Sequence, residues 1–190
     1  MGDLKRCFGN GDPLMAAYHD AEWGRPVHGD RALFEHLSLD IFQAGLSWRT
    51  ILHKREDFRW AFEGFDPQII ARYDRKQIQR LLSDPGIVRN RLKIEATISN
   101  ARAVLAMQEQ GGSFDGFLWS FTDSRTLRGP RAMRWEMLPT VSPESEAMSK
   151  GLKEHGFKFV GSTICYAFMQ AVGMIDDHLA FCHRYRAFPD

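Results

Sequence analysis

The chain has 190 residues, a size typical of one domain, and 44% of them are hydrophobic, as in ordinary soluble proteins. Its 25 Lys and Arg against 24 Asp and Glu give a net charge of +1, which excludes binding to nucleic acid or membranes through overall charge, so any contact with a polyanion needs a local patch. No apolar stretch approaches the about 20 residues that cross a bilayer, and no apolar core of a secretory signal follows the first residues, so we expect a cytoplasmic protein that makes no membrane contact.

Apolar side chains recur mainly at intervals of three and four residues, which is the period of an amphipathic helix. The first such stripe predicts a helix over 33–44, with Asp30 as its N-cap. The next stripe predicts a second helix over 48–62, which ends before Gly64.

Three more helices are predicted along the next part of the chain. Asp66 followed by Pro67 predicts the start of a short helix, because Asp caps a helix and Pro suits its first position. Asp74 is the expected cap of the following helix, which ends at the turn 83–86. A long helix is then predicted from Ile87 to the glycine pair that starts at residue 111.

The last third of the chain has a helix start at Ser142 and a weaker pattern before it. Residues 123–140 are predicted to form a long surface connection that carries four arginines: Arg125, Arg128, Arg131 and Arg134. Strands alternating with turns are not indicated anywhere, so the fold is expected to be all-α.

Two pairs of cysteine and histidine near the two ends of the chain form a candidate metal site. His178 and Cys182 are four residues apart, which places both side chains on one face if the segment is helical. Together with Cys7 and His19 they would make a closed tetrahedral set for one structural Zn²⁺ per chain. The alternative is four ordinary side chains, because no zinc-finger spacing joins the two pairs.

The turn 83–86 and the residues after it form a candidate phosphate site. Gly86 is expected to supply permissive backbone dihedrals, and the amides that follow it, of Ile87, Val88 and Arg89, would then be free donors near a helix N-terminus. The stretch is also locally cationic through Arg89, Arg91, Lys93 and Arg102. On these residues alone, a plain helical hairpin is the favoured alternative. Phosphate contacts of this kind would position a duplex without reading its bases.

Aromatic residues gather around the first two predicted helices. Tyr18, Trp23, Phe42 and Trp48 could form a box for a planar ligand, and Asp40 lies about two helical turns before Trp48. Its carboxylate could accept a hydrogen bond from an exocyclic amine or attract a cationic ring. On these residues alone, a helical core with Asp40 at the surface or in a cap is the favoured alternative.

Several motifs occur in one order and resemble the 3-methyladenine DNA glycosylase I family. The most specific is Phe42-Gln43-Ala44-Gly45-Leu46-Ser47-Trp48, and the hairpin stretch 86–94 is another. Further matches are residues 6–7, 12–14, 18–20, 22–24, 54–56, 117–121, 149–150, 156–161, 163–166, 168–171 and 177–178. The resemblance covers nearly the whole chain and is weakest over 122–139.

The resemblance implies a helix-hairpin-helix glycosylase fold, in which residues 1–190 form a single domain with two helical lobes. It implies zinc ligands that fasten the N- and C-terminal segments to each other: Cys7, His19, His178 and Cys182. It also implies that a monomer contacts duplex DNA through the hairpin, at Gly86, Ile87, Val88 and Arg89.

The activity that the resemblance implies is a step of base excision repair. The enzyme flips 3-methyladenine out of alkylated double-stranded DNA and hydrolyses its N-glycosidic bond, which leaves an abasic site. Tyr18 and Trp48 match stacking aromatics, and Asp40 matches the position of the recognition carboxylate. Methylation at N3 makes the base a cationic, good leaving group, and no lysine for a lyase step is evident.

One departure from the family pattern lies in the base site. Asp40-Ile41 stands where the family usually has Glu-Gly, so the carboxylate loses the reach of about one carbon–carbon bond, roughly 1.5 Å. Errors of ~1 Å in a site can cost about 100-fold in rate. The alternative function is therefore a catalytically weak, zinc-fastened module that binds damaged DNA. A second departure is Phe8, where a tryptophan is frequent.

Overall fold

The computed structural model describes residues 4–185. In chain order, its elements are α1 (Pro13–Ala21), α2 (Asp30–Gln43), α3 (Trp48–His53), α4 (Arg55–Ala61), the 3₁₀ helix η1 (Glu63–Phe65), α5 (Pro67–Ile70), α6 (Arg75–Ser83), α7 (Arg91–Glu109), α8 (Phe114–Trp119), the 3₁₀ helix η2 (Ser120–Thr122), β1 (Leu127–Arg128), the 3₁₀ helix η3 (Trp135–Met137), α9 (Pro143–Glu154), α10 (Ser162–Ala171) and β2 (Ile175–Asp176).

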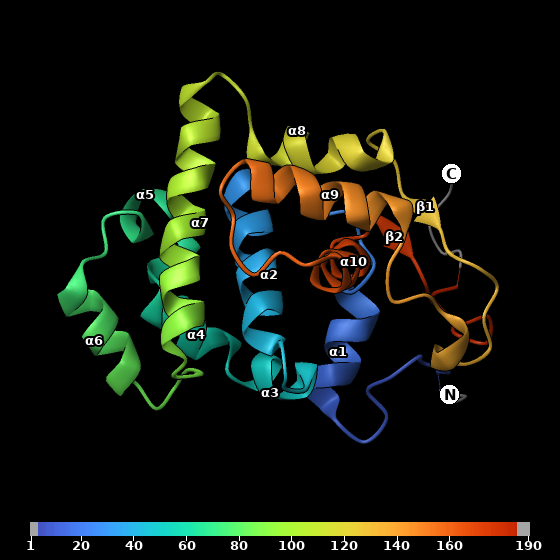
Figure 1. Ribbon diagram of the computed structural model, residues 1–190. Coiled ribbons are helices and arrows are strands. Elements are labelled where there is room, and N and C mark those ends of the chain that lie inside the picture. Colours follow the sequence, from blue (N-terminus) through green and yellow to red (C-terminus); the bar gives the residue numbers. More distant parts are fainter. Residues whose placement is uncertain (1–3, 186–190) are drawn as a thin grey trace.

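The arrangement is mostly helical and centres on α2 (Figure 1). Helices α4 to α7 lie on one side of α2 in this view, and α1, α9 and α10 lie on the other. The two strands pair in parallel, Leu127 with Ile175 and Arg128 with Asp176. This pairing adds a two-stranded ladder that the all-α prediction did not contain. The prediction of a single domain with two lobes stays a prediction.

Buried aromatic side chains connect the helices around α2. Phe42 of α2 packs against Phe58 of α4 with ring centroids 4.7 Å apart, and against Phe62 at 5.7 Å. Phe62 in turn stacks on Phe65 at 5.5 Å. All four rings are fully buried, and burial of a side chain of this size stabilises the fold by about 1.5–3 kcal/mol. The core thus holds α2 rigidly between its neighbours.

Three of the predicted helix starts are confirmed by their caps. The side chain of Asp66 accepts a hydrogen bond from the Gln68 amide at 2.8 Å, with a proline at the start of α5. Asp74 forms a capping box with Gln77, and Ser142 forms one with the residue three positions on, at the start of α9.

Three predicted helix boundaries are wrong. The long helix expected from Ile87 begins only at Arg91, because Asn90 is its N-cap. Gly29 is the N-cap of α2, whereas Asp30 lies inside the helix and accepts hydrogen bonds from the Asp115 amide and the Gln108 side chain. The predicted helix 48–62 is two helices, because the backbone leaves helical geometry at Lys54, with φ −101° and ψ 2°. The apolar stripe continues across that break, so periodicity alone does not reveal it.

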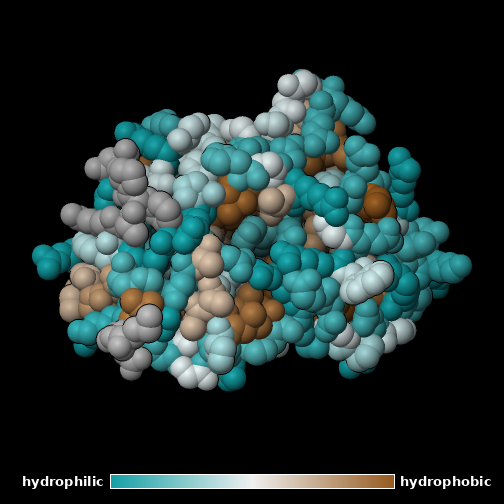
Figure 2. Space-filling model, turned by 180° about the vertical axis from the view of Figure 1, so that it is seen from behind, coloured by the Kyte–Doolittle hydropathy of each residue, from teal (hydrophilic) through white to brown (hydrophobic). Residues whose placement is uncertain are grey.

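No described helix is long and apolar enough to cross a membrane. The face opposite to that of Figure 1 is largely hydrophilic, with small separate hydrophobic patches (Figure 2). Scattered patches of this kind are ordinary on a protein surface.

Candidate functional site

A cavity of about 190 Å³ opens between α1, α2, α3, α10 and η3. An apolar cavity of about 150 Å³ holds a benzene ring, so the volume suits one planar heterocycle. The aromatic residues that line the cavity are Phe8, Tyr18, Trp23, Trp48 and Trp135. Its polar side chains are those of Asp40, Gln43 and Gln170.

The predicted aromatic group is brought together in this wall, with one exception. The rings of Tyr18 and Trp48 are 5.2 Å apart, and Phe8 lies 5.3 Å from Trp23. Trp48 begins α3, whose N-cap is the preceding serine, so the start of the helix fixes where the indole lies. The exception is Phe42, which belongs to the main core and was wrongly placed in the box.

Asp40 lies within α2 and only 5% of it is exposed. The alternative of a surface or capping residue is therefore wrong. Its Oδ2 atom is buried and has no hydrogen-bond partner among the described residues. Burial raises the pKa of this carboxyl well above its usual range. A buried, unpartnered polar atom costs about 1–3 kcal/mol. Since Asp40 lines the cavity, a ligand that brings an N–H donor would remove that cost.

Two further residues of the wall were not singled out from the sequence. Gln170 lies in α10, and its Nε2 donates to Asp177 Oδ2 at 2.6 Å. The Tyr166 hydroxyl donates to the same oxygen at 2.7 Å. The side-chain oxygen of Gln170, Oε1, accepts no hydrogen bond from residues 4–185. Trp135 comes from the predicted surface connection, where no periodic signal points to a cavity.

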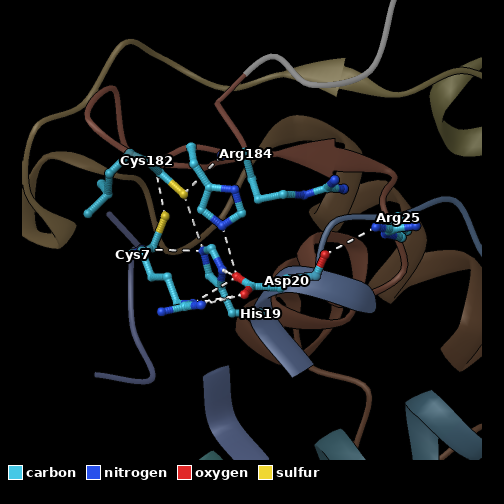
Figure 3. Close-up of polar contacts among 9 residues, drawn as sticks. Cys7, His19, Asp20, Arg25, Cys182 and Arg184 are labelled. Carbon is cyan, nitrogen blue, oxygen red and sulfur yellow. Dashed lines mark hydrogen bonds and ion pairs between the residues drawn. The ribbon is translucent and has the colours of Figure 1, made fainter. Parts of the chain in front are cut away.

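Three of the four predicted metal ligands meet at the junction of the terminal segments (Figure 3). The Sγ atoms of Cys7 and Cys182 and a ring nitrogen of His19 all lie within 4.8 Å of one another. The distance from Cys182 Sγ to His19 Nε2 is 3.3 Å. Bonds of about 2.3 Å to sulfur and about 2.0 Å to nitrogen separate the two ligand atoms of a tetrahedral zinc ion by roughly 3.6 Å. The spacing therefore fits such an ion.

The fourth predicted ligand, His178, lies outside this group of three but beside it. Its ring centroid is 5.4 Å from that of His19, and its buried Nε2 has no partner among the described residues. His178 Nδ1 contacts Asp176 Oδ1 at 2.9 Å, and His19 Nδ1 contacts Asp20 Oδ1 at the same distance. A carboxylate on Nδ1 is the usual outer partner of a histidine that binds metal through Nε2. The donor set thus fits zinc.

The segment that carries His178 and Cys182 is not helical, so the one-face prediction is wrong in its geometry. The chain leaves β2 and folds through turns, in which the Cys182 amide donates to the Leu179 carbonyl at 2.8 Å. The Leu179 amide donates to Cys7 Sγ at 3.2 Å. These turns, and not a helix, bring the C-terminal pair to Cys7.

The two cysteines differ in how tightly they hold a proton. A hydrogen bond from Cys7, together with one from His19, lowers the pKa of the Cys182 thiol to about 3. The hydrogen bond that the Cys7 thiol donates to Cys182 raises the pKa of Cys7, because its proton is held there. A thiolate is the form that binds metal, so Cys182 is ready to bind a cation, whereas Cys7 would release its proton on binding.

The predicted hairpin is present between α6 and α7, but glycine is needed there for a different reason. The φ of Gly86 is not in the left-handed range, so the dihedral argument is wrong. A Cβ at this position would lie 3.0 Å from both the Asp57 Cβ and Asp84 Oδ1, so a side chain would fit only if these neighbours shifted by a few tenths of an ångström. The Gly86 amide is not free, because it donates to Asp84 Oδ1 at 2.8 Å.

The next three amides, of Ile87, Val88 and Arg89, have no acceptor recorded within the described part of the chain. They lie between the turn and the first residue of α7. This part of the candidate phosphate site therefore matches the expectation of unpaired donors before a helix.

Most of the predicted cations are occupied elsewhere. Lys93 is buried and donates to the carbonyl oxygens at the end of α2, those of Phe42 at 3.0 Å and Ala44. Arg102 donates to the Ala71 carbonyl, and Arg91 pairs with a glutamate one turn on. Of the four, only Arg89 is exposed without a recorded partner in residues 4–185. Arg89 is thus the side chain available to a phosphate.

Comparison with known proteins gives one consistent result. The sequence profile of the family described as methyladenine glycosylase matches residues 8–185. DNA-3-methyladenine glycosylase 1 of Escherichia coli (strain K12) is 47% identical over 180 residues, which cover 94% of this chain and 96% of that protein. DNA-3-methyladenine glycosylase of Haemophilus influenzae (strain Rd) is 45% identical over 165 residues, with 87% and 89% covered.

Solved structures agree with this result. A crystal structure of 3-methyladenine DNA glycosylase I superposes with a TM-score of 0.91 at 50% identity, covering 94% of this chain and 98% of that one. A Staphylococcus aureus structure described as the basis of 3-methyladenine recognition also gives a TM-score of 0.91, at 36% identity, and covers 99% and 100% of the two chains.

Proposed function

Because this chain belongs to the methyladenine glycosylase family, we propose that it hydrolyses the N-glycosidic bond of 3-methyladenine in alkylated double-stranded DNA. The reaction releases the free base and leaves an abasic site in the repair of damaged DNA. The observation that carries the proposal is the buried, unpartnered carboxyl of Asp40 in a cavity walled by aromatic rings.

The cavity is suited to a base that has been turned out of the duplex. Methylation at N3 puts a positive charge on adenine in DNA, and aromatic faces such as those of Tyr18 and Trp48 attract a cationic ring. Asp40 is the acceptor for the exocyclic amine. Burial disfavours the carboxylate, whereas a cation beside it supplies the missing counter-charge. A neutral adenine supplies none, which favours the damaged base.

The chemistry needs little from the protein beyond binding and orientation, because a cationic purine is a good leaving group. A water molecule then attacks the sugar carbon. Among the residues that line the cavity, all of them within 4–185, there is no lysine that could form a Schiff base. This supports a monofunctional hydrolase without lyase activity.

The duplex is bound through the α6–α7 hairpin, which we assign as the helix-hairpin-helix element. The amides of Ile87 and Val88 and the amide and side chain of Arg89 are the donors to backbone phosphates, and Gly86 allows the tight turn. In the view of Figure 1 this turn, α3 and η3 all lie in the lower part of the molecule.

Zinc would be held by Cys7, His19, His178 and Cys182. A set of four protein ligands leaves no position for a reactive water, so the ion would fasten the terminal segments and stabilise the fold. The monomeric state and the cytoplasmic location expected from the sequence stay predictions.

The decisive experiment treats DNA with N-methyl-N-nitrosourea, incubates it with the protein and separates released bases by chromatography. Free 3-methyladenine, released in amounts exceeding the protein, supports the enzyme. No release at stoichiometric protein, together with preferential binding to the methylated duplex, would instead favour a damage-binding module. Untreated DNA is the control for nonspecific loss of bases.

A further inference from the structure

Trp135 occupies an unexpected place at the mouth of the cavity. It begins η3, within the segment predicted to be a surface connection, and its side chain lines the cavity. The residue is 41% exposed, so one part of the indole faces the cavity while another part is open to solvent. A ligand bound in the cavity would therefore lie beside this ring.

The indole is held in place by the N-terminal segment. Its Nε1 donates a hydrogen bond to the carbonyl oxygen of Cys7 at 3.3 Å. Its ring lies 6.2 Å from that of Phe8, with an interplanar angle of 35°, and 5.9 Å from that of Trp23, at 63°. These contacts fix the position of Trp135 even though η3 has only three residues and no side-chain cap.

On this geometry we propose that Trp135 is a specificity-determining residue, whose indole contacts the extruded base at the mouth and favours a cationic base over a neutral one. The inference rests on the proposed function. Indole is the aromatic side chain that attracts cations most strongly. A base stacked on an aromatic side chain typically loses about tenfold to hundredfold in affinity when that side chain is truncated to alanine.

The rest of the wall does not replace this contact. Tyr18 and Trp23 are buried in a cluster with Leu52, so much of their surface is already covered by protein. Trp135 has no such cover on its exposed side. Phe8 and Trp48 are partly buried, so Trp135 is the most exposed of the five rings and has the largest uncovered fraction for contact with a bound base.

The test compares two small ligands that differ in charge. The 3,9-dimethyladeninium ion mimics the damaged base with its bond to sugar, and 9-methyladenine is the neutral counterpart. Dissociation constants from calorimetry give a selectivity ratio for the wild type, Trp135→Ala, Trp135→Phe and the matched control Trp60→Ala. Trp60 is 85% exposed on α4 and does not line the cavity.

We expect Trp135→Ala to bind the cation about tenfold more weakly or worse and to lose selectivity, whereas Trp60→Ala keeps both. Trp135→Phe should keep most of the selectivity because it retains an aromatic ring, although it cannot donate a hydrogen bond to the Cys7 carbonyl. It should also lose part of the fluorescence change that the cation induces in the wild type. Bound metal and melting temperature, measured on each variant, check that the fold is intact.

Two results would overturn the inference. One is an unchanged selectivity ratio in folded Trp135→Ala. The other is an equal loss in Trp135→Phe and Trp135→Ala, because the indole would then act only by anchoring Cys7. Failure of the proposed function is seen separately, as a wild type that releases no 3-methyladenine from methylated DNA.

Discussion

Replacing Asp40 by asparagine should make the stability of the protein less dependent on pH. Burial raises the pKa of this carboxyl in the folded state, whereas in the unfolded chain an aspartate titrates near pKa 3.9. Between the two values the folded protein binds one more proton than the unfolded chain. The free energy of unfolding therefore falls as pH rises, by about 1.36 kcal/mol for each pH unit in that window.

Asp40→Asn removes the titration and keeps the size of the side chain. The free energy of unfolding of the variant minus that of the wild type should therefore increase with pH above about 4, at up to about 1.36 kcal/mol per unit. Urea unfolding of metal-loaded protein at several pH values between 5 and 8 measures this difference. Asp123→Asn is the control, because that side chain is 81% exposed and should show no such trend.

The same variant tests the role of Asp40 in base release. A hydrogen bond to a charged acceptor contributes about 1.5–3 kcal/mol, and its loss in the transition state corresponds to roughly 10- to 150-fold in rate. Single-turnover release of 3-methyladenine should slow by that factor while the fold is kept. If the free energy of unfolding changes with pH equally in the variant and the wild type, the raised pKa of Asp40 is refuted. An unchanged rate of base release would show that Asp40 takes no part in recognition.

Three further variants test the other parts of the molecule. His178→Ala should reduce bound zinc and the melting temperature, measured by elemental analysis and calorimetry; full zinc content would show that this histidine is not a ligand. Arg89→Ala should weaken duplex binding equally for all sequences and lower the salt dependence of log Kd by about one ion, whereas a change in base preference would contradict a phosphate contact. Gly86→Ala should lower the melting temperature by several degrees, because contact between its Cβ and Asp57 would reduce the free energy of unfolding by about 1–2 kcal/mol. An unchanged melting temperature would mean that the turn relaxes around the new methyl group.

Capping signals predicted three helix starts, whereas the expected cap Asp30 lies inside α2. Asp66, Asp74 and Ser142 each cap the helix that they were expected to cap, because an N-cap depends on a side chain and the amides next to it. The break at Lys54 and the turns around His178 depend on what packs against them. Such tertiary effects leave no periodic trace in the sequence.

Some residues of the candidate site could be predicted from the sequence and others could not. Tyr18, Asp40 and Trp48, which the resemblance implied as base-site residues, line one cavity. The local excess of basic residues around the hairpin misled for Lys93. Its ammonium donates to carbonyl oxygens at the end of α2, which lies far from α7 in the sequence. Trp135 could not be found, since the segment that carries it has no pattern and reaches the cavity only through the fold.

The cavity and the cysteine–histidine cluster are parts of one construction. Trp23 of the cavity wall packs on His178 with ring centroids 4.5 Å apart, and Phe8 packs on His19 at 4.9 Å. Phe8 also follows Cys7 directly, and the Cys7 carbonyl anchors Trp135. An ion that fixes the two histidines and Cys7 would therefore also fix three rings of the wall. A zinc ion bound there would thus act on base selection without touching the base, because the aromatic wall packs on the residues that would bind it.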